Sequence, residues 1–124
     1  MKLPDVSSAN LDSYFNKEEY IIKTAEQIMK DFALFGVEIT FSGEVKNAHQ
    51  EMHQQLVAQI DELSGNEQEK LKSILYQIDI GQKDIQTIKN GLSDHSFNDL
   101  LAHQIILREL KKVVLRNYFK EQGI

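Results

Sequence analysis

The chain has 124 residues, of which 41% are hydrophobic and 27% are charged, and its formal net charge is −5. This length fits one domain that can bury a core without disulfides or metals, and the composition argues against a disordered chain. The sequence contains no cysteine, which excludes disulfides, thiol nucleophiles and thiolate metal sites.

The charge is distributed unevenly along the chain. Residues 1–62 carry a net charge of −6, whereas residues 96–124 carry +2. An acidic protein repels a phosphate backbone, so nucleic acid is an unlikely partner. The N-terminal residues lack the apolar core of a signal peptide, and no apolar run approaches the roughly 18–20 residues that a membrane span needs. We therefore expect a cytoplasmic protein without a membrane partner.

Small polar side chains dominate residues 1–13, which predicts a flexible N-terminal arm before a single helical domain at 14–124. The first helix is expected to begin at Asn16, because Asn16 and Glu19 have the spacing of a capping box. Apolar side chains then recur every three or four residues as far as Phe35. Gly36 stands where a helix-ending glycine is expected.

A different pattern follows directly. Residues 37–41 alternate strictly between apolar and polar side chains, and three of the five are β-branched, which predicts a short strand. A lone strand leaves half of its backbone polar groups unpaired. We therefore expect this segment to pair either within the chain or with a second copy, with an apolar face formed by Val37, Ile39 and Phe41.

The remaining periodic segments predict four further helices, at about 44–63, 65–78, 82–90 and 96–120. Capping-box spacing appears at Ser64 with Glu67 and at Ser96 with Asp99. The predicted fold is therefore mainly α, a compact bundle of four to five helices with one short β element, at about 37–41, after the first helix.

Histidines form the pattern that most resembles a chemical site. His49 and His53 are four residues apart, so they lie on one helix face and could share a metal ion, with a third ligand from His103, His95 or Asp99. Glu51 lies about 100° around the helix from that face, so this is not the zincin arrangement. The alternative interpretation is that both histidines border the apolar stripe as ordinary half-buried residues.

Basic residues recur along the last helix. Arg108, Lys112, Arg116 and Lys120 are spaced four apart and form a ridge that could contact an acidic partner, including the acidic half of a second copy. The alternative is a solvated face, since positive charge near a helix C-terminus is favoured by the helix dipole.

These features favour a non-catalytic protein–protein interaction module, or a self-associating helical module, without a cofactor. Its partner is then itself, as a homodimer or another homo-oligomer, or a different protein. The alternative is a small metal- or ligand-binding protein or enzyme that uses His49, His53 and His103. A second alternative is weak nucleic-acid binding through the basic C-terminal helix. Phosphate-binding loops and nucleophile elbows are absent from the sequence, which disfavours an enzyme.

Overall fold

The computed structural model describes residues 10–90 and 96–123, and this part of the chain is mainly helical. Two short elements are a one-turn helix near the start, α1 (Leu11–Tyr14), and a 3₁₀ turn, η2 (Val45–Asn47). The five longer helices are α2 (Glu18–Ala33), α3 (Ala48–Asn66), α4 (Gln68–Gln77), α5 (Gln82–Asn90) and α6 (Phe97–Glu121).

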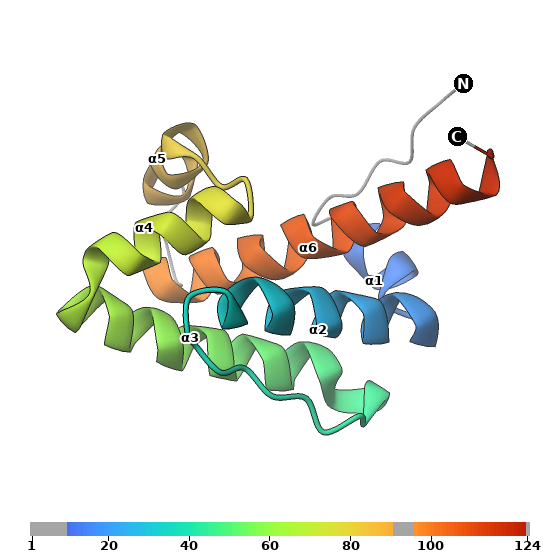
Figure 1. Ribbon diagram of the computed structural model, residues 1–124, viewed down its shortest axis with the longest axis horizontal. Coiled ribbons are helices and arrows are strands. Elements are labelled where there is room, and N and C mark those ends of the chain that lie inside the picture. Colours follow the sequence, from blue (N-terminus) through green and yellow to red (C-terminus); the bar gives the residue numbers. More distant parts are fainter. Residues whose placement is uncertain (1–9, 91–95, 124) are drawn as a thin grey trace.

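The longest helix, α6, organises the bundle. It runs antiparallel to α2 and packs against α2, α3 and α5 (Figure 1). The helices α2 and α6 diverge toward the C-terminal end of α6, whereas α4 and α5 cover them at the other end. The core lies where α2, α3, α4 and α6 meet, around fully buried side chains such as Ile28, Leu56, Ile74 and Ile105.

The predicted bundle of four to five helices is confirmed, and one predicted start is confirmed in detail. Ser96 caps α6, because its hydroxyl oxygen accepts a hydrogen bond from the backbone N–H of Asp99. The predicted helix at 82–90 matches α5.

Two other predicted starts are wrong. Asn16 is exposed and lies before α2, whose N-cap position is held by Lys17 without a side-chain hydrogen bond. Ser64 does not open a helix, because α3 continues through Ser64 and Gly65 to Asn66. Capping motifs describe a local preference, and here the helical hydrogen bonds continue past Ser64, since the backbone N–H of Glu67 donates to the Leu63 carbonyl at 2.8 Å.

The predicted β element at 37–41 is also not observed: residues 10–90 and 96–123 contain no strand. The side chains of the segment do alternate, with Val37 and Ile39 buried and Thr40 exposed. The backbone, however, is held by side chains of α3 and not by another strand. The side-chain amide of Gln55 accepts from the Thr40 N–H (2.8 Å) and donates to the Thr40 carbonyl. Residues 37–41 therefore form no ladder of backbone hydrogen bonds with another described segment.

The predicted arm at 1–13 lies mostly outside the description, which begins at residue 10; α1 covers its last residues. Within the described ranges, each helix is either too short or too polar to cross a bilayer.

Candidate functional site

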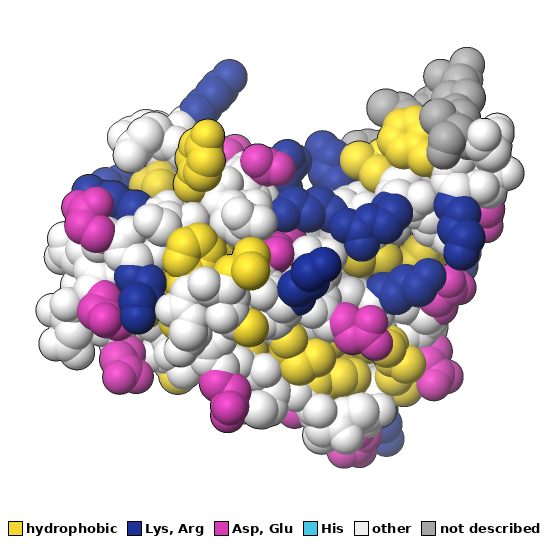
Figure 2. Space-filling model, in the orientation of Figure 1, with side chains coloured by type: hydrophobic (Ala, Val, Ile, Leu, Met, Phe, Trp, Pro, Cys, Tyr) yellow, Lys and Arg dark blue, Asp and Glu magenta, His cyan; other side chains and the backbone are white. Residues whose placement is uncertain are grey.

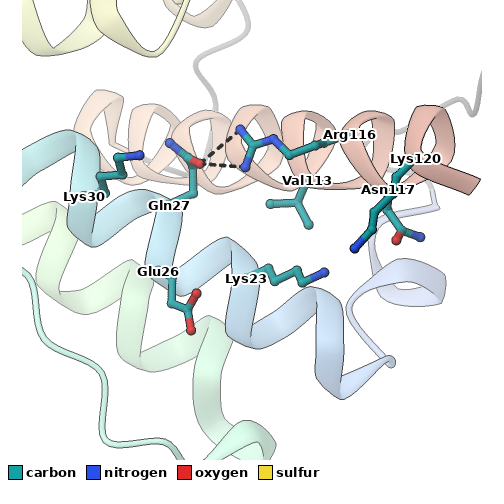
Figure 3. A pocket seen from close by; sticks show the side chains of 8 residues that line it. All are labelled: Lys23, Glu26, Gln27, Lys30, Val113, Arg116, Asn117 and Lys120. Carbon is teal, nitrogen blue, oxygen red and sulfur yellow. Dashed lines mark hydrogen bonds between the residues drawn. The ribbon is translucent and has the colours of Figure 1, made fainter. Parts of the chain in front are cut away.

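A groove between α2 and α6 brings five charged side chains together on the described surface. Both helices contribute residues at positions i, i+3, i+4 and i+7, the spacing that normally forms an apolar packing seam. Here seven of the eight side chains are polar, so the helices enclose an open pocket of about 340 Å³, lined by Lys23, Glu26, Gln27, Lys30, Val113, Arg116, Asn117 and Lys120 (Figure 3).

Four cations and one carboxylate line this groove. Space-filling representation shows the same excess, since Lys and Arg side chains gather over α2 and the C-terminal half of α6 (Figure 2). The Glu26 carboxylate points away from α6, whereas the Lys23 and Lys120 side chains extend into the space between the helices (Figure 3). The groove therefore presents a net positive field to solvent.

Few of these cations are neutralised inside the molecule. Lys23 pairs with Glu19 at 2.8 Å, and this contact lowers the pKa of the exposed Glu19 carboxyl. Lys30, Arg116 and Lys120 have no carboxylate at ion-pair distance among the described residues. Arg116 instead donates from both terminal nitrogens to the Gln27 side-chain oxygen, at 3.3 Å each.

The predicted basic ridge is divided by the fold. Only Arg116 and Lys120 line the groove. Arg108 turns toward Asp79, 3.7 Å away, beyond the end of α4. Lys112 lies between α2 and α6 with 23% of its side chain exposed. Sequence reasoning missed Lys23 and Lys30, whose seven-residue spacing was visible but whose position opposite α6 was not.

Beneath the closed end of the groove lies a buried charged cluster. Glu109 of α6 is fully buried and Asp31 of α2 is 3% exposed. The Lys112 ammonium lies 3.1 Å from a Glu109 carboxyl oxygen and 3.6 Å from an Asp31 oxygen. It also donates to the Gln77 backbone carbonyl at 3.4 Å. Two carboxyl groups thus share one buried cation.

The pKa of Glu109 is raised to about 8, first by burial and then by the adjacent Asp31, whose effect exceeds the opposing effect of Lys112. Apart from Lys112, no described residue directs a hydrogen-bond donor at the Glu109 oxygens or at Oδ2 of Asp31. A proton held by Glu109 supplies this missing donor, because a neutral carboxylic acid can donate to the Asp31 carboxylate. At neutral pH Glu109 therefore holds its proton, and the Lys112 ammonium lies close to both carboxyl groups.

The three candidate histidines do converge. His49 and His53 of α3 stack at a ring-centroid distance of 6.2 Å, and His103 of α6 lies at the same distance from His49. They line one pocket with Asp99, whose backbone carbonyl is 3.1 Å from Nε2 of His53. Burial, and secondly the charge of His53, lowers the pKa of His103.

A metal centre at these histidines stays a prediction, and His95 lies outside the described residues. Within residues 10–90 and 96–123, no group of three or more His, Asp or Glu side chains has the arrangement needed to hold a metal ion. His53 donates through Nε2 to a carbonyl in this arrangement, which leaves Nδ1 as its basic nitrogen. The cluster contacts Phe15 through His49 and joins α3 to α6.

Self-association through Val37, Ile39 and Phe41 also stays a prediction. Val37 and Ile39 lie in the core, and Phe41 packs against it while half-buried. Gln55 and Glu51 occupy one edge of this segment: the Glu51 carboxylate accepts from the backbone N–H and the hydroxyl of Ser42. A second copy would have to pair with the opposite edge.

Comparison of the chain with protein-family models, with curated proteins and with solved structures gives no match. The groove, the buried cluster and the histidine pocket therefore have to be interpreted from their own chemistry.

Proposed function

We propose that the protein is a non-catalytic interaction module whose groove between α2 and α6 binds an acidic segment of a partner protein. The observation that carries this proposal is the lining of the groove, which contains four cations, one carboxylate and a single apolar side chain, Val113. Complementary charge of this kind accelerates association and selects against partners of the wrong sign.

The layout of the cations favours a peptide over a single small anion. Lys23 and Lys30 are seven residues apart on α2, which corresponds to roughly 10.5 Å along the helix. Lys23 and Lys30 are thus about two turns apart, whereas Arg116 and Lys120 on α6 are about one turn apart. Charges spread along a groove match a row of carboxylates, and about three residues of an extended chain span this length.

The partner is more consistent with a different protein than with a second copy. Adjacent acidic residues occur in this chain only as pairs, such as Glu18 with Glu19 and Asp61 with Glu62. A pair of carboxylates does not extend along two helical turns, and Glu19 is already paired with Lys23.

The test is the binding of a fluorescein-labelled decaglutamate peptide, measured by fluorescence anisotropy in low salt. We expect Lys120→Glu and Lys30→Glu each to weaken binding about tenfold, because each replaces attraction by repulsion. Raising the ionic strength from about 0.01 M to 0.1 M shortens the screening length from about 30 Å to 10 Å, and should weaken binding as well.

Lys83→Glu is the matched control, since it changes the net charge equally on exposed α5, away from the groove. It should leave affinity within about twofold of the wild type. If Lys83→Glu lost as much peptide affinity as the groove variants, the effect would come from the overall charge of the protein, and a groove site would be refuted. A competition experiment adds tripolyphosphate at a concentration that supplies as much negative charge as the peptide. If tripolyphosphate displaces the peptide and binds more tightly than it does, the groove is a site for small anions. Salt-sensitive dimers in light scattering would assign it to a second copy.

A further inference from the structure

The charged cluster around Glu109 continues the two helix faces that form the groove. Asp31 follows Gln27 by one turn on α2, and Glu109 precedes Val113 by one turn on α6. One turn rises about 5.4 Å. Where the helices diverge, these faces are open and lined with cations; where they close, the same faces bury two carboxyl groups.

A continuous chain of polar contacts joins the two regions. Arg116, in the groove wall, donates to Oε1 of Gln27. The Nε2 group of Gln27 donates to Oδ1 of Asp31 at 3.1 Å. Only this orientation of the amide suits both neighbours, because a guanidinium can only donate and a carboxylate can only accept. Asp31 in turn contacts the shared Lys112 and the protonated Glu109.

We infer that the protonation state of Glu109 controls the affinity of the groove for its acidic partner, an inference that rests on the proposed function. With a proton on Glu109, the cluster carries one negative charge fewer than after ionisation, and the groove keeps its full positive field. When Glu109 releases the proton to solvent, the cluster gains one negative charge about one helical turn below the groove floor. That charge opposes an anionic ligand and attracts the cations that would otherwise contact it.

Few other groups can produce this effect. The charged groups that act on Glu109 are Asp31 from α2 and Lys112 from its own helix, while α4 contributes the Gln77 carbonyl to Lys112. On the other side, Arg108 faces Asp79 from the turn after α4. No charged side chain of α3 or α5 acts on Glu109 within the described part of the chain. Burial raises the pKa of Glu109 to about 8, so its ionisation falls between pH 7 and 9.

By linkage, the coupling acts in both directions. A bound acidic peptide should make loss of the Glu109 proton harder, so binding near pH 8 should be accompanied by proton uptake. The experiment measures the affinity of the decaglutamate peptide at pH 7 and pH 9 in wild type and in Glu109→Gln. The amide of glutamine mimics the protonated acid in shape and charge.

We expect wild type to lose about three- to tenfold in affinity between pH 7 and pH 9, and Glu109→Gln to change less than about twofold. Glu62→Gln, an exposed change on α3, should keep the wild-type response. An equal pH response in Glu109→Gln and wild type, or an affinity independent of pH in wild type, would overturn the coupling while leaving the groove as a binding site. Failure of wild type to bind at pH 7 would instead remove the proposed function, and this inference with it.

A second measurement needs no variant. Carbon NMR of the carboxyl groups in uniformly labelled wild type reports the titration of Glu109 directly. Saturating peptide should shift its midpoint to higher pH by a measurable fraction of a unit. An unchanged midpoint with the peptide bound would refute the coupling even if Glu109→Gln does not fold.

Discussion

Buried carboxyl groups are costly unless they are neutralised, and Glu109 and Asp31 avoid that cost in different ways. Asp31 lies 3.6 Å from the Lys112 ammonium and accepts a hydrogen bond from Gln27. Glu109 has no exposed surface, and burial raises its pKa to about 8. At neutral pH the pair resembles one acid and one carboxylate held by a common proton, which behaves as a coupled unit.

This arrangement predicts a specific pH dependence of stability. The pKa of Glu109 is about 8 when folded, against 4.5 as the ordinary value, so between these values the folded chain binds one proton more than the unfolded chain. The stability contributed by this group is fully present below pH 4.5 and is lost as pH rises through 8. We expect the advantage of Glu109→Gln over wild type to grow by about 1.4 kcal/mol per pH unit up to about pH 7.5, then level off.

Urea denaturation at several pH values measures this difference. The window from pH 6.5 to 9 avoids His103, whose lowered pKa adds stability as pH rises through the ordinary histidine range. The exposed change Glu62→Gln should show no pH-dependent difference from wild type. Parallel curves for wild type and Glu109→Gln would mean that Glu109 is ionised throughout.

Among the elements, the segment between α2 and η2 shows how side chains can replace a strand partner. Gly36, at a φ of 73°, turns the chain after α2, and the Val37 N–H donates to the Phe32 carbonyl. Gln55 then pairs with both polar backbone groups of Thr40, as a neighbouring strand would. The segment is thereby tied to α3 without any sheet.

Gln55→Ala tests this tie. Removing the amide leaves the Thr40 N–H and carbonyl without their protein partner, and because the site is near solvent we expect a loss of about 1–2 kcal/mol in unfolding free energy. Hydrogen exchange at the Thr40 amide should accelerate at the same time. Gln54→Ala is the matched control, since Gln54 is exposed on the same helix and should change stability by less than about 0.5 kcal/mol. Similar losses in both variants would indicate a general effect of alanine on α3.

At the scale of the whole molecule, stability depends on α6 because it touches three other helices. Leu101→Ala removes a fully buried side chain from this helix, and we expect a cost of about 2–5 kcal/mol from lost burial and the resulting cavity. Leu34→Ala makes the same chemical change at a side chain that is 61% exposed. It should cost less than about 0.5 kcal/mol in urea or thermal denaturation. Comparable effects would contradict the central placement of α6.

Helical periodicity could be read from the sequence because burial repeats every 3.6 residues wherever a helix covers a core. The bounds of α5 and the Ser96 cap of α6 were predictable for that reason, since these signals are local. The start of α4 was not, because the Ser64 motif expresses only a local preference, and α3 continues through Ser64 to Asn66.

The amino-acid pattern by itself determined a helical bundle, the placement of most of its helices and the existence of basic residues on the last one. Only the tertiary structure decided which charges meet. Arg116 and Lys120 join Lys23 and Lys30 at a groove, Lys112 turns inward to two buried carboxyl groups, and Gln55 replaces the missing strand. Periodicity specifies which face of a helix is apolar, whereas the pairing of polar faces depends on how two helices cross, and that angle is set by packing far from the charges themselves.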